Sequence, residues 1–143
     1  MVLWNGDSVA VLSKNAIEYM EIYYVCARVG LIAQPINWRL GTDEIVHILE
    51  DGSPSVVISS DEYLEQIKQL KDKVVVAHWL NFGADGDGSY LSLLQSSLST
   101  EPSSSADVGG DDPMLILYTG GTTGQSKGAL HTHRSLYTGM INQ

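Results

Sequence analysis

Short runs of apolar and β-branched residues alternate along this chain with segments whose apolar residues keep helical spacing. Each short run is too brief for a helix, and its composition is typical of a buried strand. Strands alternating with helices of this length require right-handed crossovers. The pattern therefore predicts an α/β fold, a mostly parallel sheet with helices on both faces. The expected strands are residues 9–12, 32–37, 55–59, 73–78 and 114–118.

Helix boundaries are also visible in the sequence. Asn15 with Glu18 three residues later has the form of a capping box, and Gly30 is the expected end of that helix. Thr42 is expected to cap a second helix, which Gly52 closes. Further helices are expected through residues 64–70, over residues 90–95 and from about residue 133.

Composition limits the possible partners and compartments. The 143 residues include eight Lys and Arg against seventeen Asp and Glu, a formal charge of −9, which argues against nucleic acid as a partner. A hydrophobic content of 43% supplies one buried core. The single Cys26 excludes an internal disulfide framework and indicates a reducing compartment, so we expect a cytoplasmic protein. Charged residues interrupt the longest apolar region, residues 17–36, so no integral membrane segment is expected, and no signal peptide is visible at the start.

Residues 96–113 are rich in Ser, Gly, Asp and Pro. Such a segment buries too little apolar area to offset the entropy of ordering it. We expect an exposed flexible loop, with a domain boundary as the alternative.

The segment after the last expected strand has the composition of a phosphate-binding loop. Its glycine amides can turn toward one point, threonine hydroxyls can donate beside them, and a lysine adds positive charge. Ligands of open α/β sheets lie beyond the carboxyl ends of the strands, where this segment begins. We therefore expect it to bind a polyanion such as a triphosphate. The candidate residues are Thr119, Gly120, Gly121, Thr122, Thr123, Gly124 and Lys127.

Two other interpretations of this segment fit its sequence less well. A Walker P-loop needs Gly before its lysine and Ser or Thr after it, whereas Lys127 lies between Ser126 and Gly128. A glycine-rich turn without a ligand would need only the glycines. Three threonines and a lysine within nine residues favour a phosphate site instead.

The segment resembles the phosphate-binding signature of the adenylate-forming superfamily, which includes acyl-CoA synthetases, luciferases and peptide-synthetase adenylation domains. That signature usually reads Tyr-Thr-Ser-Gly-Thr-Thr-Gly-x-Pro-Lys-Gly, and Thr-His-Arg follows it, as at residues 132–134 here. Residues 118, 119, 121–124, 127 and 128 match. Upstream, residues 6–12 with Asn15, residues 35–40 and residues 44–51 are similar to the start of an acyl-CoA synthetase, so the resemblance covers nearly the whole chain.

The resemblance implies an enzyme that activates a carboxylic acid, expected to be a fatty acid, with ATP and Mg²⁺. The resulting acyl-adenylate would pass its acyl group to a thiol, with coenzyme A as the expected co-substrate. Lys127 would be the catalytic cation, and the seven candidate residues would hold the β- and γ-phosphates as charge grows on pyrophosphate. Residues 1–143 would be part of the N-terminal ATP-binding domain, with residues 114–143 as its phosphate-binding strand and loop and the following helix.

The sequence also departs from the family pattern. Gly120 replaces a serine and Ser126 replaces a proline, which weakens the site without abolishing it. The family's later Tyr-Gly-x-Thr-Glu and Thr-Gly-Asp motifs and its C-terminal lysine have no counterpart here. We therefore expect an amino-terminal fragment that is inactive alone and that forms a homo-oligomer through the surface exposed by truncation. The alternative is a non-catalytic α/β fragment acting as a weak phosphate-binding or assembly module.

Three other residue types were considered as site candidates. His131 and His133 could bind a metal from one face of a strand, but no third ligand is evident, and a role for His133 in orienting the phosphate loop is expected instead. Cys26 is expected to be a small buried hydrophobic residue. Trp38 and Trp79 are expected to pack at strand ends.

Overall fold

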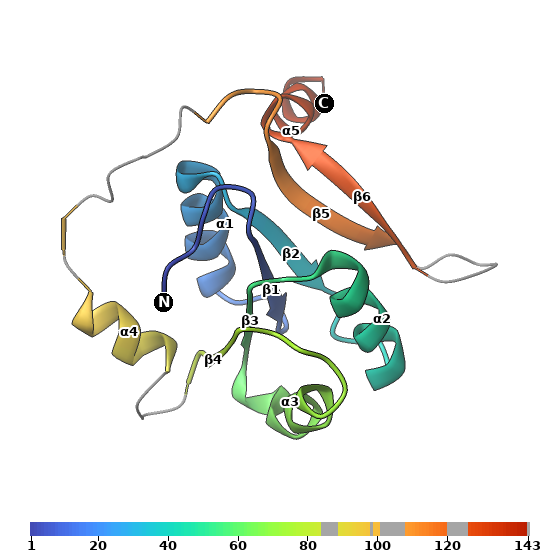
Figure 1. Ribbon diagram of the computed structural model, residues 1–143. Coiled ribbons are helices and arrows are strands. Elements are labelled where there is room, and N and C mark those ends of the chain that lie inside the picture. The colour runs from blue at the N-terminus through green and yellow to red at the C-terminus, as the bar shows by residue number, and fades with distance from the viewer. Residues whose placement is uncertain (84–88, 98, 101–107, 120–125, 143) are drawn as a thin grey trace.

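The computed structural model describes residues 1–83, 89–97, 99–100, 108–119 and 126–142. These residues form one six-stranded sheet in the order β4-β3-β1-β2-β5-β6 (Figure 1). Every neighbouring pair is parallel except β5 and β6, which are antiparallel. The strands are β1 (Ser8–Leu12), β2 (Ile32–Ile36), β3 (Val56–Ser59), β4 (His78–Asn81), β5 (Pro113–Thr119) and β6 (Lys127–Thr132).

Helices cover both faces of the sheet, and Figure 1 shows α1 on one side with α2 and α3 on the other. A short 3₁₀ turn at Asp61–Tyr63 leads into α3. The predicted α/β architecture, a mostly parallel sheet between helices, is confirmed. The helices are α1 (Glu18–Val29), α2 (Thr42–Gly52), α3 (Leu64–Lys71), α4 (Tyr90–Ser96) and α5 (His133–Ile141).

The central strand β1 explains why two cores form. Its side chains alternate across the sheet, so Val9 and Val11 pack toward α1 while Ala10 and Leu12 pack toward α2 and α3. All four are buried, which accounts for the uninterrupted apolar run of a strand covered on both faces. The parallel strands β1 to β5 have their carboxyl ends at one edge of the sheet. The segment predicted to bind phosphate, residues 119–127 and called the phosphate segment below, begins at this edge.

The fourth strand is not where the sequence predicts it. The Val-rich stretch at residues 73–78 forms the connection after α3, and β4 begins only at His78, which pairs with Val56. Val74 turns into the core beside Leu70, whereas Val75 is fully exposed. The prediction was wrong because β propensity describes a half-buried pleated surface, and here the backbone bonds back to α3 instead.

Two predicted helix caps also differ from the structure. The first helix starts at Glu18 with Ile17 at its N-cap, and no side chain caps it, so Asn15 does not have that role. In the second helix the cap position is Gly41 rather than Thr42, and the Gly41 amide donates to the Glu44 carboxylate at 2.8 Å. Gly30 does end α1, in the left-handed conformation with φ of 76°, as predicted.

Of the predicted flexible loop at residues 96–113, residues 98 and 101–107 lie outside the described residues, and Ser96 is the last residue of α4. The last residue of the predicted loop, Pro113, already belongs to β5. Among the described helices, none is both long enough and apolar enough to cross a membrane.

Candidate functional site

The candidate site is at the tip of the hairpin formed by β5 and β6. Thr119 is the last residue of β5, Lys127 is the first residue of β6, and the two are register partners in the antiparallel ladder. Directly opposed residues have Cβ atoms about 4.5–5.5 Å apart, so a hydroxyl and an ammonium group emerge side by side. Both residues are exposed. The other predicted site residues, Gly120, Gly121, Thr122, Thr123 and Gly124, lie outside the described residues.

The sequence pattern did not predict strand β6. It predicted only a helix near His133, which is indeed the first residue of α5. Residues 127–132 show no clear period-2 pattern and four of the six are exposed, so their strand conformation comes from pairing with β5. The consequence for the site is that the phosphate segment connects two hydrogen-bonded strands rather than a strand and a helix.

Gly128 has a packing reason to be glycine. It is the register partner of Tyr118, whose aromatic ring lies over it. A methyl group at Gly128 would lie 2.8 Å from Cδ1 of Ile116 and 3.1 Å from Cζ of Tyr118. A side chain here would therefore displace the residues that lead into the site.

Helix α2 contacts both strands of the hairpin close to its tip. The Tyr118 hydroxyl donates to Oδ2 of Asp51 at 2.6 Å. Just before the other strand, Nε2 of His47 lies 3.2 Å from the Ser126 carbonyl oxygen. Because that carbonyl can only accept, the bond requires the proton on Nε2. No role was predicted for His47 or Asp51, although their four-residue spacing on a helix indicates that they share a face.

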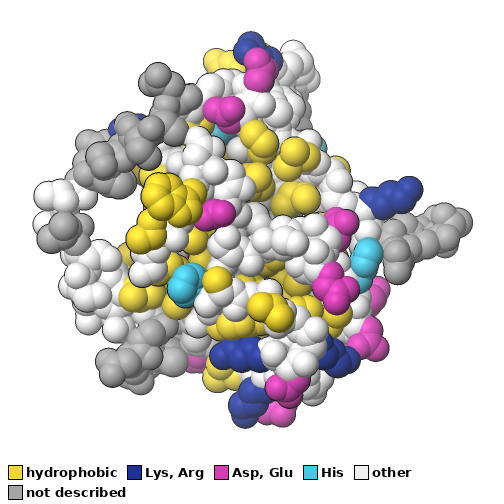
Figure 2. All heavy atoms as spheres, in the orientation of Figure 1, with side chains coloured by type: hydrophobic (Ala, Val, Ile, Leu, Met, Phe, Trp, Pro, Cys, Tyr) yellow, Lys and Arg dark blue, Asp and Glu magenta, His cyan; other side chains and the backbone are white. Residues whose placement is uncertain are grey.

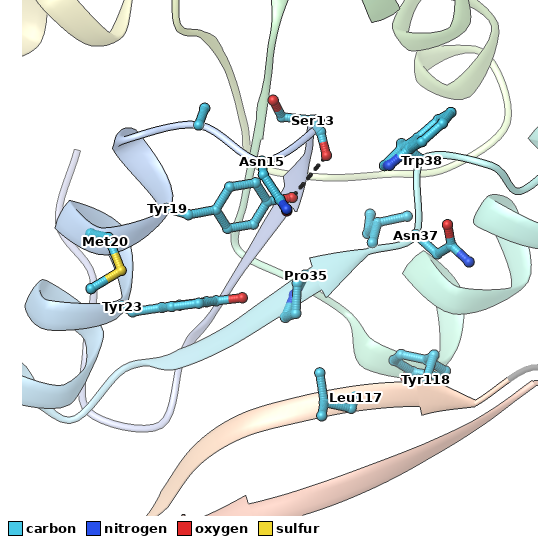
Figure 3. Close-up of a pocket in the computed structure, with 12 residues that line it drawn as sticks. Ser13, Asn15, Tyr19, Met20, Tyr23, Pro35, Asn37, Trp38, Leu117 and Tyr118 are labelled. Carbon is cyan, nitrogen blue, oxygen red and sulfur yellow. Dashed lines mark hydrogen bonds between the residues drawn. The ribbon is translucent and has the colours of Figure 1, made fainter.

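A cavity of about 500 Å³ opens at the same edge of the sheet, between α1 and the ends of β1, β2 and β5. Figure 3 shows Tyr23 reaching from α1 toward Pro35, and Tyr19 reaching from α1 toward Ser13. The Tyr19 hydroxyl donates to the Ser13 carbonyl at 3.1 Å, and burial raises the pKa of Tyr19 to about 12. Tyr118 lines this cavity too, so a ligand in it would contact the strand that leads into the phosphate segment.

Trp38 lines the cavity, and two cations lie near its ring. The Lys14 ammonium is 5.4 Å from the ring centroid and the Arg39 guanidinium is 4.4 Å from it. Both distances are in the range of cation–π attraction. Trp79 has one such neighbour, Lys71 at 5.7 Å. Both tryptophans pack against the α2 and α3 core. Trp38 follows the end of β2, as predicted, whereas Trp79 lies within β4 and not at a strand end.

The predicted role of His133 was wrong. His133 begins α5, at the base of the hairpin, and the six residues of β6 separate it from the tip, roughly 20 Å along the strand. It therefore cannot orient the phosphate segment directly, and His47 lies at the tip instead. His131 and His133 are not on one strand face either, because only His131 belongs to β6. Among the described residues there is no group of three or more His, Cys, Asp or Glu suited to a metal ion.

Cys26 is 1% exposed on the inner face of α1, among the side chains that pack on β1. Burial raises the pKa of its thiol to about 12, which makes it a poor nucleophile. Its predicted structural role is confirmed.

Comparison with known proteins decides the family. Residues 3–143 match the family model described as AMP-binding enzyme. The chain belongs to this family. The resemblance seen in the phosphate signature therefore extends over the whole fold, and the family is that of the adenylate-forming enzymes.

Several characterised relatives are ligases. The chain is 39% identical over 137 residues to a long-chain-fatty-acid–CoA ligase of Mycobacterium tuberculosis, an alignment that covers 93% of this chain and 26% of that protein. It is 36% identical over 135 residues to a fatty acid–acyl-carrier-protein ligase of Streptomyces coeruleorubidus, covering 92% and 24%. The chain thus spans about a quarter of the length of the curated relatives it matches.

Solved structures give the same result for the fold. An inhibitor-bound N-terminal domain of FACL13 from Mycobacterium tuberculosis superposes with a TM-score of 0.82 at 35% identity, covering 94% of this chain and 33% of that chain. The ATP-bound MatB of Rhodopseudomonas palustris gives a TM-score of 0.80 at 29% identity, covering 97% and 27%. This chain therefore has the fold of part of the N-terminal domain of an adenylate-forming enzyme.

Proposed function

We propose that this chain supplies the phosphate-binding part of an ATP-dependent acid–thiol ligase, which activates a carboxylic acid as an acyl-adenylate. One observation carries the proposal. Register pairing places Thr119 beside Lys127 at the carboxyl edge of the sheet, at the two ends of a Gly- and Thr-rich segment. A hydroxyl and a cation held in this way suit the β- and γ-phosphates of a nucleotide.

The proposed reaction needs no nucleophile from these residues. A carboxylate oxygen of the substrate forms a bond to the α-phosphorus of ATP, and the bond from that phosphorus to the bridging oxygen of pyrophosphate breaks. Negative charge grows on the leaving pyrophosphate, where Lys127 and Thr119 would meet it. In the second step the thiol of the acceptor takes the acyl group and AMP leaves.

The relatives support a fatty acid as the substrate and coenzyme A as the acceptor. A long-chain-fatty-acid–CoA ligase and a fatty acid–acyl-carrier-protein ligase are among them, and so is a feruloyl-CoA synthase. Fatty acids are common to the first two names, and coenzyme A is common to the first and third. We therefore propose a fatty acyl-CoA synthetase that functions in fatty acid metabolism.

The residues at the hairpin tip fit the phosphates of ATP, because Lys127 and Thr119 are exposed and side by side. Mg²⁺ would enter with the nucleotide and neutralise phosphate charge during the transfer. No described residue is assigned to Mg²⁺, since no group of three metal-binding side chains occurs in this part of the chain. A nucleic-acid partner is not proposed, because the net charge is −9.

We propose that residues 1–143 by themselves do not catalyse adenylation, since the chain spans about a quarter of its relatives. Transition-state stabilisation depends on a complete set of positioned groups. The remaining alternative for the isolated chain is a phosphate-binding or assembly module. The single buried Cys26 supports a reducing compartment, and we propose the cytoplasm.

We also propose that the isolated chain self-associates. Large apolar side chains are exposed on α1 and α5, among them Met20 at 67%, Tyr24 at 70%, Tyr137 at 65% and Met140 at 72%. Figure 2 shows groups of apolar side chains reaching the surface of one face of the molecule. Exposed patches of this kind favour association. Sedimentation velocity at micromolar concentration tests this, and a species of 15.5 kDa at every concentration would contradict it.

The test of the proposed activity is carboxylate-dependent exchange of pyrophosphate with ATP. The protein would be the complete enzyme containing residues 1–143, with acids from acetate to palmitate as substrates. Exchange is expected only when an acid is present, and Lys127→Ala should remove most of it. Lys68→Ala is the matched control, because Lys68 is an exposed lysine on α3 paired with Glu65. Exchange that ignores the acid, or that both variants lose equally, would contradict the proposal.

A further inference from the structure

Helix α2 contacts the two strands that flank the phosphate segment, through two residues one turn apart. His47 and Asp51 are four residues apart and so lie on one face of the helix. Asp51 accepts from the Tyr118 hydroxyl on β5, and His47 bonds the Ser126 carbonyl just before β6. Each contact lies within one residue of a predicted phosphate ligand, Thr119 in the first case and Lys127 in the second.

The contact on β5 holds the Tyr118 side chain and, through its packing on Gly128, the opposite strand β6. The Tyr118 ring lies over Gly128, and its hydroxyl is 2.6 Å from the Asp51 carboxylate. Burial and the neighbouring carboxylate raise the pKa of Tyr118 above its usual value, so the hydroxyl keeps its proton and donates. A neutral donor to a charged acceptor is one of the stronger hydrogen bonds.

The contact just before β6 fixes the backbone rather than a side chain. Nε2 of His47 lies 3.2 Å from the carbonyl oxygen of Ser126, and this bond is partly buried. The peptide group that bears this carbonyl includes the amide nitrogen of Lys127. Its orientation therefore sets the direction in which the Lys127 side chain leaves the strand.

We propose that His47 and Asp51 are positioning residues for the phosphate site: they hold the β5–β6 hairpin so that Thr119 and Lys127 face the nucleotide together. This inference rests on the proposed function. Neither residue is proposed as a ligand. The Asp51 carboxylate would repel phosphate and is bonded to Tyr118, and Nε2 of His47 is bonded to a carbonyl.

Two pairs of variants separate positioning from folding. His47→Leu removes the donor, whereas His47→Gln keeps a side-chain N–H at a similar reach. Asp51→Ala and Tyr118→Phe each break the same bond, so the double variant should be little worse than the poorer single variant. His78→Leu, on β4 at the far edge of the sheet, and Tyr24→Phe, an exposed tyrosine on α1, are matched controls.

The first measurement is amide hydrogen exchange on this chain, without nucleotide. Breaking either contact should speed exchange of the β6 amides by about 10-fold, which corresponds to about 1.4 kcal/mol, a loss in the range of one hydrogen bond. The amides of β1 should be unchanged. Unchanged β6 exchange in His47→Leu and Asp51→Ala would overturn the inference.

The second measurement is adenylate formation by the complete enzyme, with the KM for ATP separated from the KM for the acid. His47→Leu and Asp51→Ala should lower kcat/KM for ATP by roughly 10-fold, because small misplacements of positioned groups are costly. The KM for the acid should not change, and His47→Gln should recover most of the loss. A wild-type enzyme without acid-dependent exchange would refute the proposed function. An active wild type whose His47→Leu and Asp51→Ala variants keep their kcat/KM for ATP would refute this inference alone.

Discussion

The strands β1, β2 and β3 and the hairpin β5–β6 belong to one sheet, yet they differ in how much of their surface is buried. All residues of β1 and β3 are buried, and helices cover both of their faces. No residue of β5, β6 or α5 is buried, and the last buried hydrophobic residue among those described is Phe82. The buried strands therefore provide most of the stability, and the exposed hairpin carries the candidate phosphate-binding residues.

This difference has a physical reason. Burial of apolar area stabilises a sheet in proportion to the area removed from water, so the doubly covered strands hold the fold together. A phosphate site needs exposed donors and a cation, which a closed core cannot offer. Hydrogen bonds to α2 connect the two parts, through Tyr118 and Ser126. Substitutions in each part should therefore have different effects, and these differences can be measured.

The largest expected effect is on the stability of the covered strands. Leu12 is fully buried on β1, and Leu12→Ala should lower the free energy of unfolding by roughly 2–5 kcal/mol through lost burial and a cavity. Leu130→Ala on β6, where the side chain is 55% exposed, should cost less than about 0.5 kcal/mol. Urea unfolding followed by circular dichroism measures both. Equal losses would show that the hairpin belongs to the same cooperative core.

The reverse is expected for Lys127→Ala, because Lys127 is exposed at the tip of the hairpin. In the complete enzyme, adenylate formation should slow by roughly 10²-fold, as when a preorganised donor is removed. The free energy of unfolding should stay within about 0.5 kcal/mol of wild type. Acyl transfer from a preformed adenylate should be less affected. Equal loss in both half-reactions would instead indicate a structural role for Lys127.

Gly128→Ala should have an intermediate effect, on the hairpin alone. The added methyl group meets Ile116 and Tyr118, and such overpacking typically costs 1–3 kcal/mol. Gly139→Ala on α5 is the matched control, because nothing lies within 4 Å of the added group and alanine favours a helix. Thermal unfolding should show a lower midpoint for the first variant and an equal or higher one for the second. A tolerated Gly128→Ala would mean that the Tyr118 ring is free to move.

The smallest expected effect is a dependence on alkaline pH that comes from the covered part of the sheet. Burial raises the pKa of the Cys26 thiol from 9.0 to about 12. Between these values the unfolded chain loses a proton that the folded chain keeps, so stability is complete below pH 9 and falls as pH rises toward 12. The slope for one thiol is at most about 1.4 kcal/mol per pH unit. Urea unfolding at pH 8, 9 and 10 should show a shallower decline in Cys26→Ala, and identical slopes would contradict this assignment.

Local patterns in the sequence were enough for the elements that bury their own surface. The apolar run of β1 can only be a strand covered on both faces, and Gly30 ends α1 because its left-handed backbone suits glycine. The phosphate signature was equally visible, because backbone amides, hydroxyls and a lysine must follow one another closely to reach one polyanion. These features depend on neighbours within a few residues, and periodicity and composition record such neighbours directly.

Long-range pairing decided the rest. Pairing with β3 makes β4 begin at His78 and not at residue 73, although the Val-rich run before His78 has the higher β propensity. Pairing with β5 made a strand of residues 127–132 and set Lys127 beside Thr119. His47 and Ser126 are 79 positions apart in the chain, and Tyr118 and Asp51 are 67 apart. Contacts at such separations leave no periodic trace in a single sequence, because they follow from how the helices and strands pack together and not from the residues next to them.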